Sequence, residues 1–207
     1  MKLTEQAQFV RDFVSEFKTV GLIQMQTLLY KSYGIEREAA KYLISSLCKK
    51  QLVHFDETGE YLLPGDNRSG AEVKLSAVKQ LWIPILLCQT KLDCQSIKKM
   101  RMRAGDVLFV ADNKTCHLVL ADVNNLTETK ELLGAAEREK RRIEKFKDVS
   151  VQSMIPRVYV LFDSTVTKEK AQFIAESFEF DAYFSVFRVR NENIGETFQY
   201  QIIKNFD

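Results

Sequence analysis

Residues 36–63, EREAAKYLISSLCKKQLVHFDETGEYLL, decide the fold expected for the N-terminal part of the chain. The first half has apolar residues at helical spacing, and the second half has two short hydrophobic runs around a turn. The helix is expected from about Glu36 to Lys50. Its apolar stripe consists of Ala39, Ala40, Leu43, Ile44 and Leu47. The stretch therefore predicts a helix followed directly by a β-hairpin.

The hairpin strands are expected at 52–55 and 61–63, and Gly59 suits the positive φ of the turn between them. Two further helices precede this stretch. Thr4 can cap the first, whose apolar residues are Phe9, Val10, Phe13, Val14 and Phe17. The second follows Gly21, carries Met25, Leu28 and Leu29, and ends near Tyr33 and Gly34. Three helices and a hairpin in this order predict a winged helix-turn-helix, a module that usually places a helix in the major groove of DNA.

The outer face of the third helix carries the residues that we expect to contact DNA. At 100° per residue, Glu38, Lys41, Tyr42 and Ser45 point away from the apolar stripe, with Arg37 on its flank. Lysine and arginine bond phosphate or guanine, and tyrosine and serine bond phosphate. The DNA-binding candidates are therefore Arg37, Lys41, Tyr42 and Ser45. The alternative is a merely solvated face, since Glu38 repels phosphate.

The hairpin turn is acidic, with Asp56, Glu57 and Glu60 at its tip. A wing that enters the minor groove normally carries arginine or lysine, so we do not expect this one to do so. The acidic wing weakens the DNA interpretation and favours a protein-binding winged helix as an alternative.

Composition limits the class of protein. The 207 residues are 45% hydrophobic and carry a formal charge of only +2, so any DNA binding must come from a local basic face. No stretch approaches 18 consecutive apolar residues, and Met1–Thr4 lead into an amphipathic helix rather than a signal peptide. The four cysteines show no paired spacing, which is typical of reduced thiols. We therefore expect a cytoplasmic protein without membrane association.

A linker is expected at residues 64–72, which separates the winged helix (1–63) from an α/β domain (73–207). Residues 75–86 fit a helix that Pro84 would kink, with a buried strand through 81–88 as the alternative. Strands are then expected at 106–110, 117–122, 157–162, 182–189 and 197–203, and helices at 127–147 and 167–178. This alternation predicts a mixed sheet flanked by helices.

The element order resembles the replication-relaxation type of protein of bacterial plasmids and conjugative elements. The second domain of that type is similar to the PD-(D/E)xK, restriction-endonuclease-like core. The matching residues are Gly105-Asp106 on the first strand and Asp122-Val123-Asn124 at the end of the second. The resemblance implies a role in the replication, transfer or regulation of a mobile element.

Nuclease chemistry needs two carboxylates that hold Mg²⁺ and a lysine near the attacking water. Asp106 and Asp122 are the catalytic candidates that the resemblance implies. Asn124 stands where the family has lysine, and Gly105 stands where it has proline. Lys114 or Lys130 could substitute for the lysine. We expect an inactive nuclease-like scaffold, because two aspartates at strand ends more often serve turns and caps.

Other site chemistry is sparse. The two histidines, His54 and His117, fall in different predicted domains and lack zinc-ligand spacing, and the chain has no glycine-rich phosphate loop. We therefore expect no metal site and no small-molecule cofactor.

Two basic stretches could extend a DNA footprint across the second domain. Arg101 and Arg103, within residues 98–103, would project from one face and are DNA-binding candidates. Arg138, Arg141, Arg142 and Lys145 cluster on the predicted helix 127–147, where interleaved glutamates favour a solvated face. For residues 98–103 both interpretations stay open.

Three hypotheses of different classes follow. The first is a DNA-binding protein without catalysis. The second is a protein-interaction adaptor in which the winged helix forms a homodimer. The third is a Mg²⁺-dependent nuclease.

Overall fold

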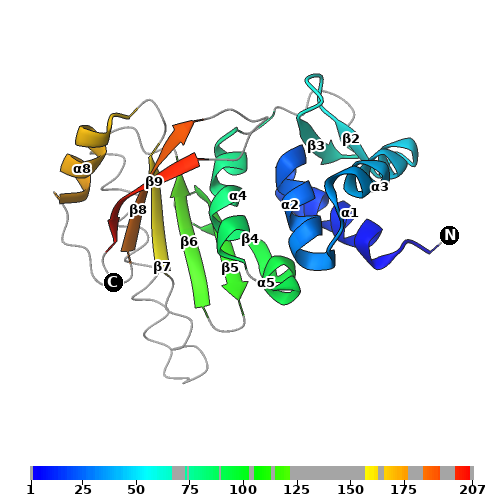
Figure 1. The fold of residues 1–207 in the computed structure, drawn as a ribbon, viewed down its shortest axis with the longest axis horizontal. Coiled ribbons are helices and arrows are strands. Elements are labelled where there is room, and N and C mark those ends of the chain that lie inside the picture. The colour runs from blue at the N-terminus through cyan, green and yellow to red at the C-terminus, as the bar shows by residue number, and fades with distance from the viewer. Residues whose placement is uncertain are drawn as a thin grey trace. The chain divides into compact units, whose positions relative to one another are not determined.

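The chain combines helices with two sheets and divides into two compact units, residues 1–97 and 98–207. The computed structural model describes residues 2–66, 73, 75–88, 90–102, 105–112, 115–121, 157–162, 166–176, 184–191 and 199–205. Figure 1 shows the elements of both units.

Three helices begin the N-terminal unit: α1 (Glu5–Phe17), α2 (Leu22–Tyr33) and α3 (Arg37–Lys49). The Thr4 hydroxyl accepts a hydrogen bond from the Ala7 amide at 3.3 Å, which confirms the predicted N-cap of α1. Gly34 has a φ of 66° and ends α2, as its position predicts, because glycine adopts the left-handed region without a steric cost.

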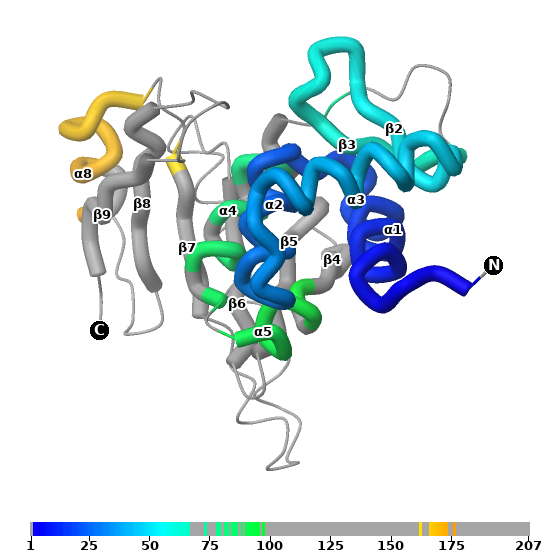
Figure 2. The backbone as a smooth tube through the Cα atoms, turned by 45° about the vertical axis from the view of Figure 1, so that its right-hand side comes forward, coloured from blue at the N-terminus to red at the C-terminus, as the bar shows by residue number. Residues whose placement is uncertain are grey.

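A three-stranded antiparallel sheet completes this arrangement: β1 (Val20–Gly21), β2 (Val53–Phe55) and β3 (Tyr61–Pro64), in the order β1–β3–β2. The hairpin of β2 and β3 was expected from the sequence. The short β1 was not, since its two residues acquire strand geometry only by pairing with Leu62 and Tyr61. Figure 2 shows the hairpin projecting beside α3.

Two more helices, α4 (Leu75–Leu87) and α5 (Lys91–Ser96), belong to the same compact unit. Both pack on α2. Helix α4 contains Pro84, in agreement with the predicted helix rather than the alternative strand. The sequence placed a domain boundary at 64–72, whereas the compact unit continues to Ile97 because α4 and α5 cover α2. Among the described residues, no helix is long and apolar enough to cross a membrane.

The second unit contains a six-stranded sheet whose strands follow one another in chain order. Its strands are β4 (Ile97–Met102), β5 (Gly105–Asp112), β6 (Thr115–Ala121), β7 (Arg157–Phe162), β8 (Phe184–Asn191) and β9 (Gln199–Asn205). The pairs β5–β6 and β8–β9 are antiparallel, and β6–β7 and β7–β8 are parallel. This sheet therefore contains both parallel and antiparallel pairs.

Helix α8 (Lys168–Glu176) lies between β7 and β8 in the chain and packs on β8 and β9 (Figure 1). A helical connection is the usual way to join two parallel neighbouring strands. Strand β4 was not expected from the sequence. The helix predicted at 127–147 lies outside the described residues.

Candidate nucleic-acid interface on α3

Helix α3 is oriented by a narrow apolar stripe. Ala40, Ile44 and Leu47 are almost completely buried, and the helix packs on α1, α2 and β2 through this side. Leu43 is half-buried at the edge of the stripe, and Ala39 is exposed. The prediction that Ala39 belongs to the buried stripe is wrong, because the packed side is centred on the i, i+4, i+7 positions that begin at Ala40.

All four residues predicted to contact DNA from this helix are exposed: Arg37, Lys41, Tyr42 and Ser45. Tyr42 is the most exposed of the large hydrophobic residues among those described, with 77% of its surface accessible. Positions 38, 41, 42 and 45 are neighbours at spacings of three and four residues, so they form one continuous patch over about two turns. We call residues 37, 38, 41, 42 and 45 the α3 face.

Glu38 forms an ion pair within the α3 face. Its Oε1 lies 2.7 Å from the Nζ of Lys41, and both side chains are largely exposed. The hydrogen bond from Lys41, followed by the charge of the same lysine, lowers the pKa of the Glu38 carboxyl, and Arg37 contributes a smaller effect. The sequence had placed Glu38 on this face, but not its pairing with Lys41.

Positive charge continues along the exposed side of α3. Lys49 and Lys50 are exposed at its C-terminal end, and Glu36 is exposed before its first turn. Including the α3 face, the helix and its caps expose four cations and two carboxylates. The surplus of positive charge is local, in a chain whose formal charge is only +2.

The turn between β2 and β3 is acidic, unlike the α3 face, and one of its carboxylates stabilises the turn itself. The Asp56 carboxylate accepts hydrogen bonds from the Thr58 hydroxyl at 2.7 Å and from the amides of Thr58, Glu60 and Tyr61 at 2.9–3.2 Å. Asp56 therefore shapes the turn rather than facing a ligand. Glu57 and Glu60 are exposed, so the tip of the hairpin presents carboxylates without a basic residue.

The structure describes only some of the site residues that were predicted for the second unit. Arg101 lies in β4 and Asp106 lies in β5. Arg103 and Asp122 lie outside the described residues, as do Lys114, Asn124, Lys130 and the predicted basic helix. The Asp106–Asp122 pair and the Arg101–Arg103 pair therefore stay predictions.

The described residues contain no group of three or more histidine, cysteine or acidic side chains suited to a metal ion. Cys48, Cys88 and Cys94 are free thiols. The hydrogen bond with Cys94, together with burial, raises the pKa of the Cys88 thiol, and the same hydrogen bond lowers the pKa of Cys94 to about 7. No sequence spacing had indicated that these two cysteines meet.

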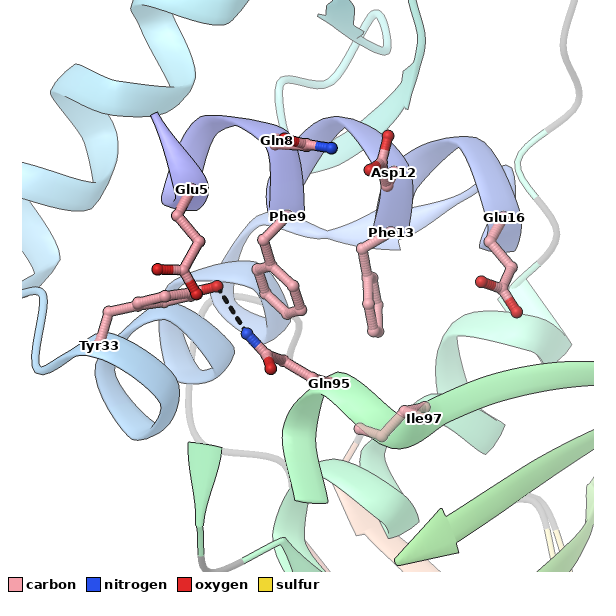
Figure 3. A pocket seen from close by; sticks show the side chains of 9 residues that line it. All are labelled: Glu5, Gln8, Phe9, Asp12, Phe13, Glu16, Tyr33, Gln95 and Ile97. Atoms are coloured by element: carbon pink, nitrogen blue, oxygen red, sulfur yellow. Dashed lines mark hydrogen bonds between the residues drawn. The ribbon is translucent and has the colours of Figure 1, made fainter. Parts of the chain in front are cut away.

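A separate recess of about 340 Å³ lies along α1 (Figure 3). Rings of Phe9, Phe13 and Tyr33 line it, with Phe9 5.5 Å from Phe13 and 5.7 Å from Tyr33 between centroids. The remaining lining residues are Glu5, Gln8, Asp12, Glu16, Gln95 and Ile97. The recess thus combines aromatic rings with carboxylates, and the helical spacing of Phe9 and Phe13 had not indicated it.

Comparison with known proteins finds no matching family model, no matching curated protein and no matching solved structure.

Proposed function

We propose that the N-terminal unit is a winged helix-turn-helix that binds duplex DNA through the α3 face, without catalysis. The observation that carries the proposal is the exposure of Arg37, Lys41, Tyr42 and Ser45 together on one side of a single helix. The order α1–β1–α2–α3–β2–β3 and the sheet order β1–β3–β2 support it, because a helix presented beside a small antiparallel hairpin suits entry into the major groove.

Each residue of the α3 face has a role in this proposal. Arg37 and Lys41 donate to phosphate oxygens or to guanine, and the hydroxyls of Tyr42 and Ser45 donate to phosphates. The acidic hairpin turn stays outside the minor groove, since its carboxylates would meet the strongest negative potential of the duplex there. Such binding would serve replication, transfer or regulation of a mobile element, as the resemblance in element order implies.

The test is the affinity of the full chain for a labelled duplex, measured by fluorescence anisotropy for the wild type and for the double variant Arg37→Ala, Lys41→Ala. We expect the double variant to bind about tenfold more weakly or worse, because two cations leave the contact surface. The matched control is Lys2→Ala, Lys168→Ala, which removes the same charge from exposed positions outside α3. Equal weakening by both double variants would contradict the proposal.

A protein-interaction adaptor is the second candidate, and the recess along α1 favours it. Its aromatic lining suits an apolar peptide side chain rather than DNA, while the carboxylates of Glu5 and Asp12 are paired with Lys91 and Arg11 of this chain. The acidic hairpin turn agrees with this alternative. Absence of DNA binding even at low salt would favour the adaptor over the DNA-binding proposal.

A further inference from the structure

We infer that Glu38 and Lys41 together select a guanine–cytosine base pair in the major groove. The inference rests on the proposed DNA binding through the α3 face, and it names the base pair that this face prefers. It starts from the one feature of the face that a purely phosphate-binding helix would not have, a carboxylate at its centre.

The two head groups are already held side by side. Glu38 Oε1 and Lys41 Nζ are 2.7 Å apart, while 73% and 45% of the respective side chains are exposed. Burial of Ala40 and Ile44 fixes the rotation of the helix, so both residues face outward together. They lie in the N-terminal half of a 13-residue helix, which is the part of a recognition helix that reaches base edges.

A carboxylate in this position limits what the face can contact. The DNA backbone repels it, so Glu38 reduces affinity for phosphates at every sequence. A favourable hydrogen bond offsets this repulsion only where a base presents a donor to Glu38. In the major groove, glutamate and aspartate accept from the amino group of cytosine. An uncharged residue would serve a sequence-independent phosphate contact better.

The order of donors and acceptors across a base pair decides between guanine–cytosine and adenine–thymine. The guanine–cytosine edge presents two neighbouring acceptors, N7 and O6, followed by the cytosine amino donor. A cation over the two acceptors and an anion over the donor match this edge. The adenine–thymine edge places its amino donor between two separate acceptors, so a carboxylate on that donor leaves the neighbouring lysine with one acceptor, whereas on the guanine–cytosine edge the lysine meets two.

The spacing of the two groups also matches neighbouring donor and acceptor atoms of one base pair, while the choice between pairs rests on the order of those atoms. The guanine O6 and cytosine N4 atoms are joined by a Watson–Crick hydrogen bond, whose length is roughly 2.9 Å for a typical N–H···O contact. The separation of the Glu38 and Lys41 head groups, 2.7 Å, is close to that length. The Glu38 carboxyl is an acidic group whose ordinary pKa, 4.5, lies well below neutral, and Lys41 lowers it further, so the acceptor is charged at neutral pH.

Glu38→Gln is a clean variant for testing this inference. An exposed ion pair at i, i+3 stabilises a helix by only about 0.2–0.5 kcal/mol, so its removal leaves the fold intact. Glutamine keeps the shape of the side chain, removes the charge and can bond adenine with both amide atoms. Glu57→Gln in the β2–β3 turn is the matched control, because Glu57 is also exposed but lies off α3.

The experiment selects bound duplexes from a pool with a randomised central segment, using the full-length wild type, Glu38→Gln and Glu57→Gln. We expect wild type and Glu57→Gln to enrich the same motif with one guanine–cytosine pair that Glu38→Gln no longer requires. On the selected duplex, replacing this pair by adenine–thymine should weaken wild-type binding about tenfold and Glu38→Gln binding much less.

The outcomes separate the inference from the proposed function. Binding without any enriched guanine–cytosine position, or a motif that Glu38→Gln leaves unchanged, would overturn the inference while DNA binding stands. A wild type that retains no duplex from the pool even at low salt would overturn both. Circular dichroism of the variants, equal to that of the wild type, verifies that the change is in recognition and not in folding.

Discussion

At the scale of single residues, Asp56 shows how one carboxylate can fix a turn. It accepts three backbone amides and one hydroxyl within residues 58–61. Burial alone would raise the pKa of the Asp56 carboxyl, but the hydrogen bonds from Thr58, Tyr61 and Glu60 outweigh it and lower the pKa below the ordinary 3.8. The ionised form is therefore the one that the folded turn stabilises.

Asp56→Asn should lower the free energy of unfolding at neutral pH by about 1 kcal/mol, because an amide replaces a charged acceptor. A lowered folded pKa gives stability that is present above 3.8 and lost as the pH falls through the folded value. The difference between variant and wild type should therefore shrink in acid. This difference in the free energy of unfolding is measured by urea titration, followed by the fluorescence of Trp82, the only tryptophan. A difference that stays constant with pH would contradict this account.

At the scale of elements, two side chains of α2 hold α4. The buried Gln24 accepts from the Gly21 amide at 2.9 Å and donates to the Val78 carbonyl at 2.6 Å. Lys31 donates to the carbonyls of Ile85, Leu86 and Cys88 at 2.7, 3.2 and 2.8 Å. An ammonium at this end of α4 satisfies carbonyls that have no intrahelical partner and complements the helix dipole.

Lys31→Met should lower the free energy of unfolding by about 2 kcal/mol, since it keeps the apolar stem but removes charge-assisted hydrogen bonds to three carbonyls. Trp82 lies in α4, so its fluorescence in a urea titration reports the loss of stability directly. Lys49→Met at the exposed end of α3 is the control and should change stability by less than about 0.5 kcal/mol. Equal effects of the two substitutions would show that Lys31 does not hold α4.

Elements with local signals could be predicted from the sequence, and elements formed by distant pairing could not. Helices α2 and α3, the start of α1 and the β2–β3 hairpin lie within a residue or two of their predicted bounds, because Thr4, Gly34 and Gly59 act locally. Strand β1 exists only through pairing with β3, about forty residues away. The boundary at Ile97 depends on contacts such as Gln24 with Val78, which no local pattern records.

The candidate site likewise has features that a local sequence pattern predicts and features that it does not. Helical periodicity was sufficient to place Arg37, Lys41, Tyr42 and Ser45 on one exposed side of α3. It could not decide the edge of the buried stripe, where Ala39 is exposed, because that depends on how closely α1 and α2 approach. The pairing of Glu38 with Lys41 depends on side-chain rotamers, which spacing permits but does not fix.

At the scale of the whole molecule, the N-terminal unit extends well beyond the hairpin. A fragment of residues 1–97 should fold and unfold cooperatively, because it keeps α4 and α5 on α2. A fragment of residues 1–66 should unfold at lower urea, since it leaves Gln24 and the apolar side of α2 uncovered. Circular dichroism at increasing urea concentration gives the unfolding midpoints of the two fragments. Equal midpoints would mean that α4 and α5 add nothing to the stability of this unit.

The central claim is DNA binding through the α3 face, and its most direct test is the salt dependence of affinity for duplex DNA. Anisotropy titrations over a salt series give the slope of log affinity against log salt, which counts the phosphates neutralised. We predict a steep slope for the wild type and a slope smaller by at least about one for Arg37→Ala, Lys41→Ala. An equal slope for both proteins, or no binding by the wild type at low salt, would contradict the claim.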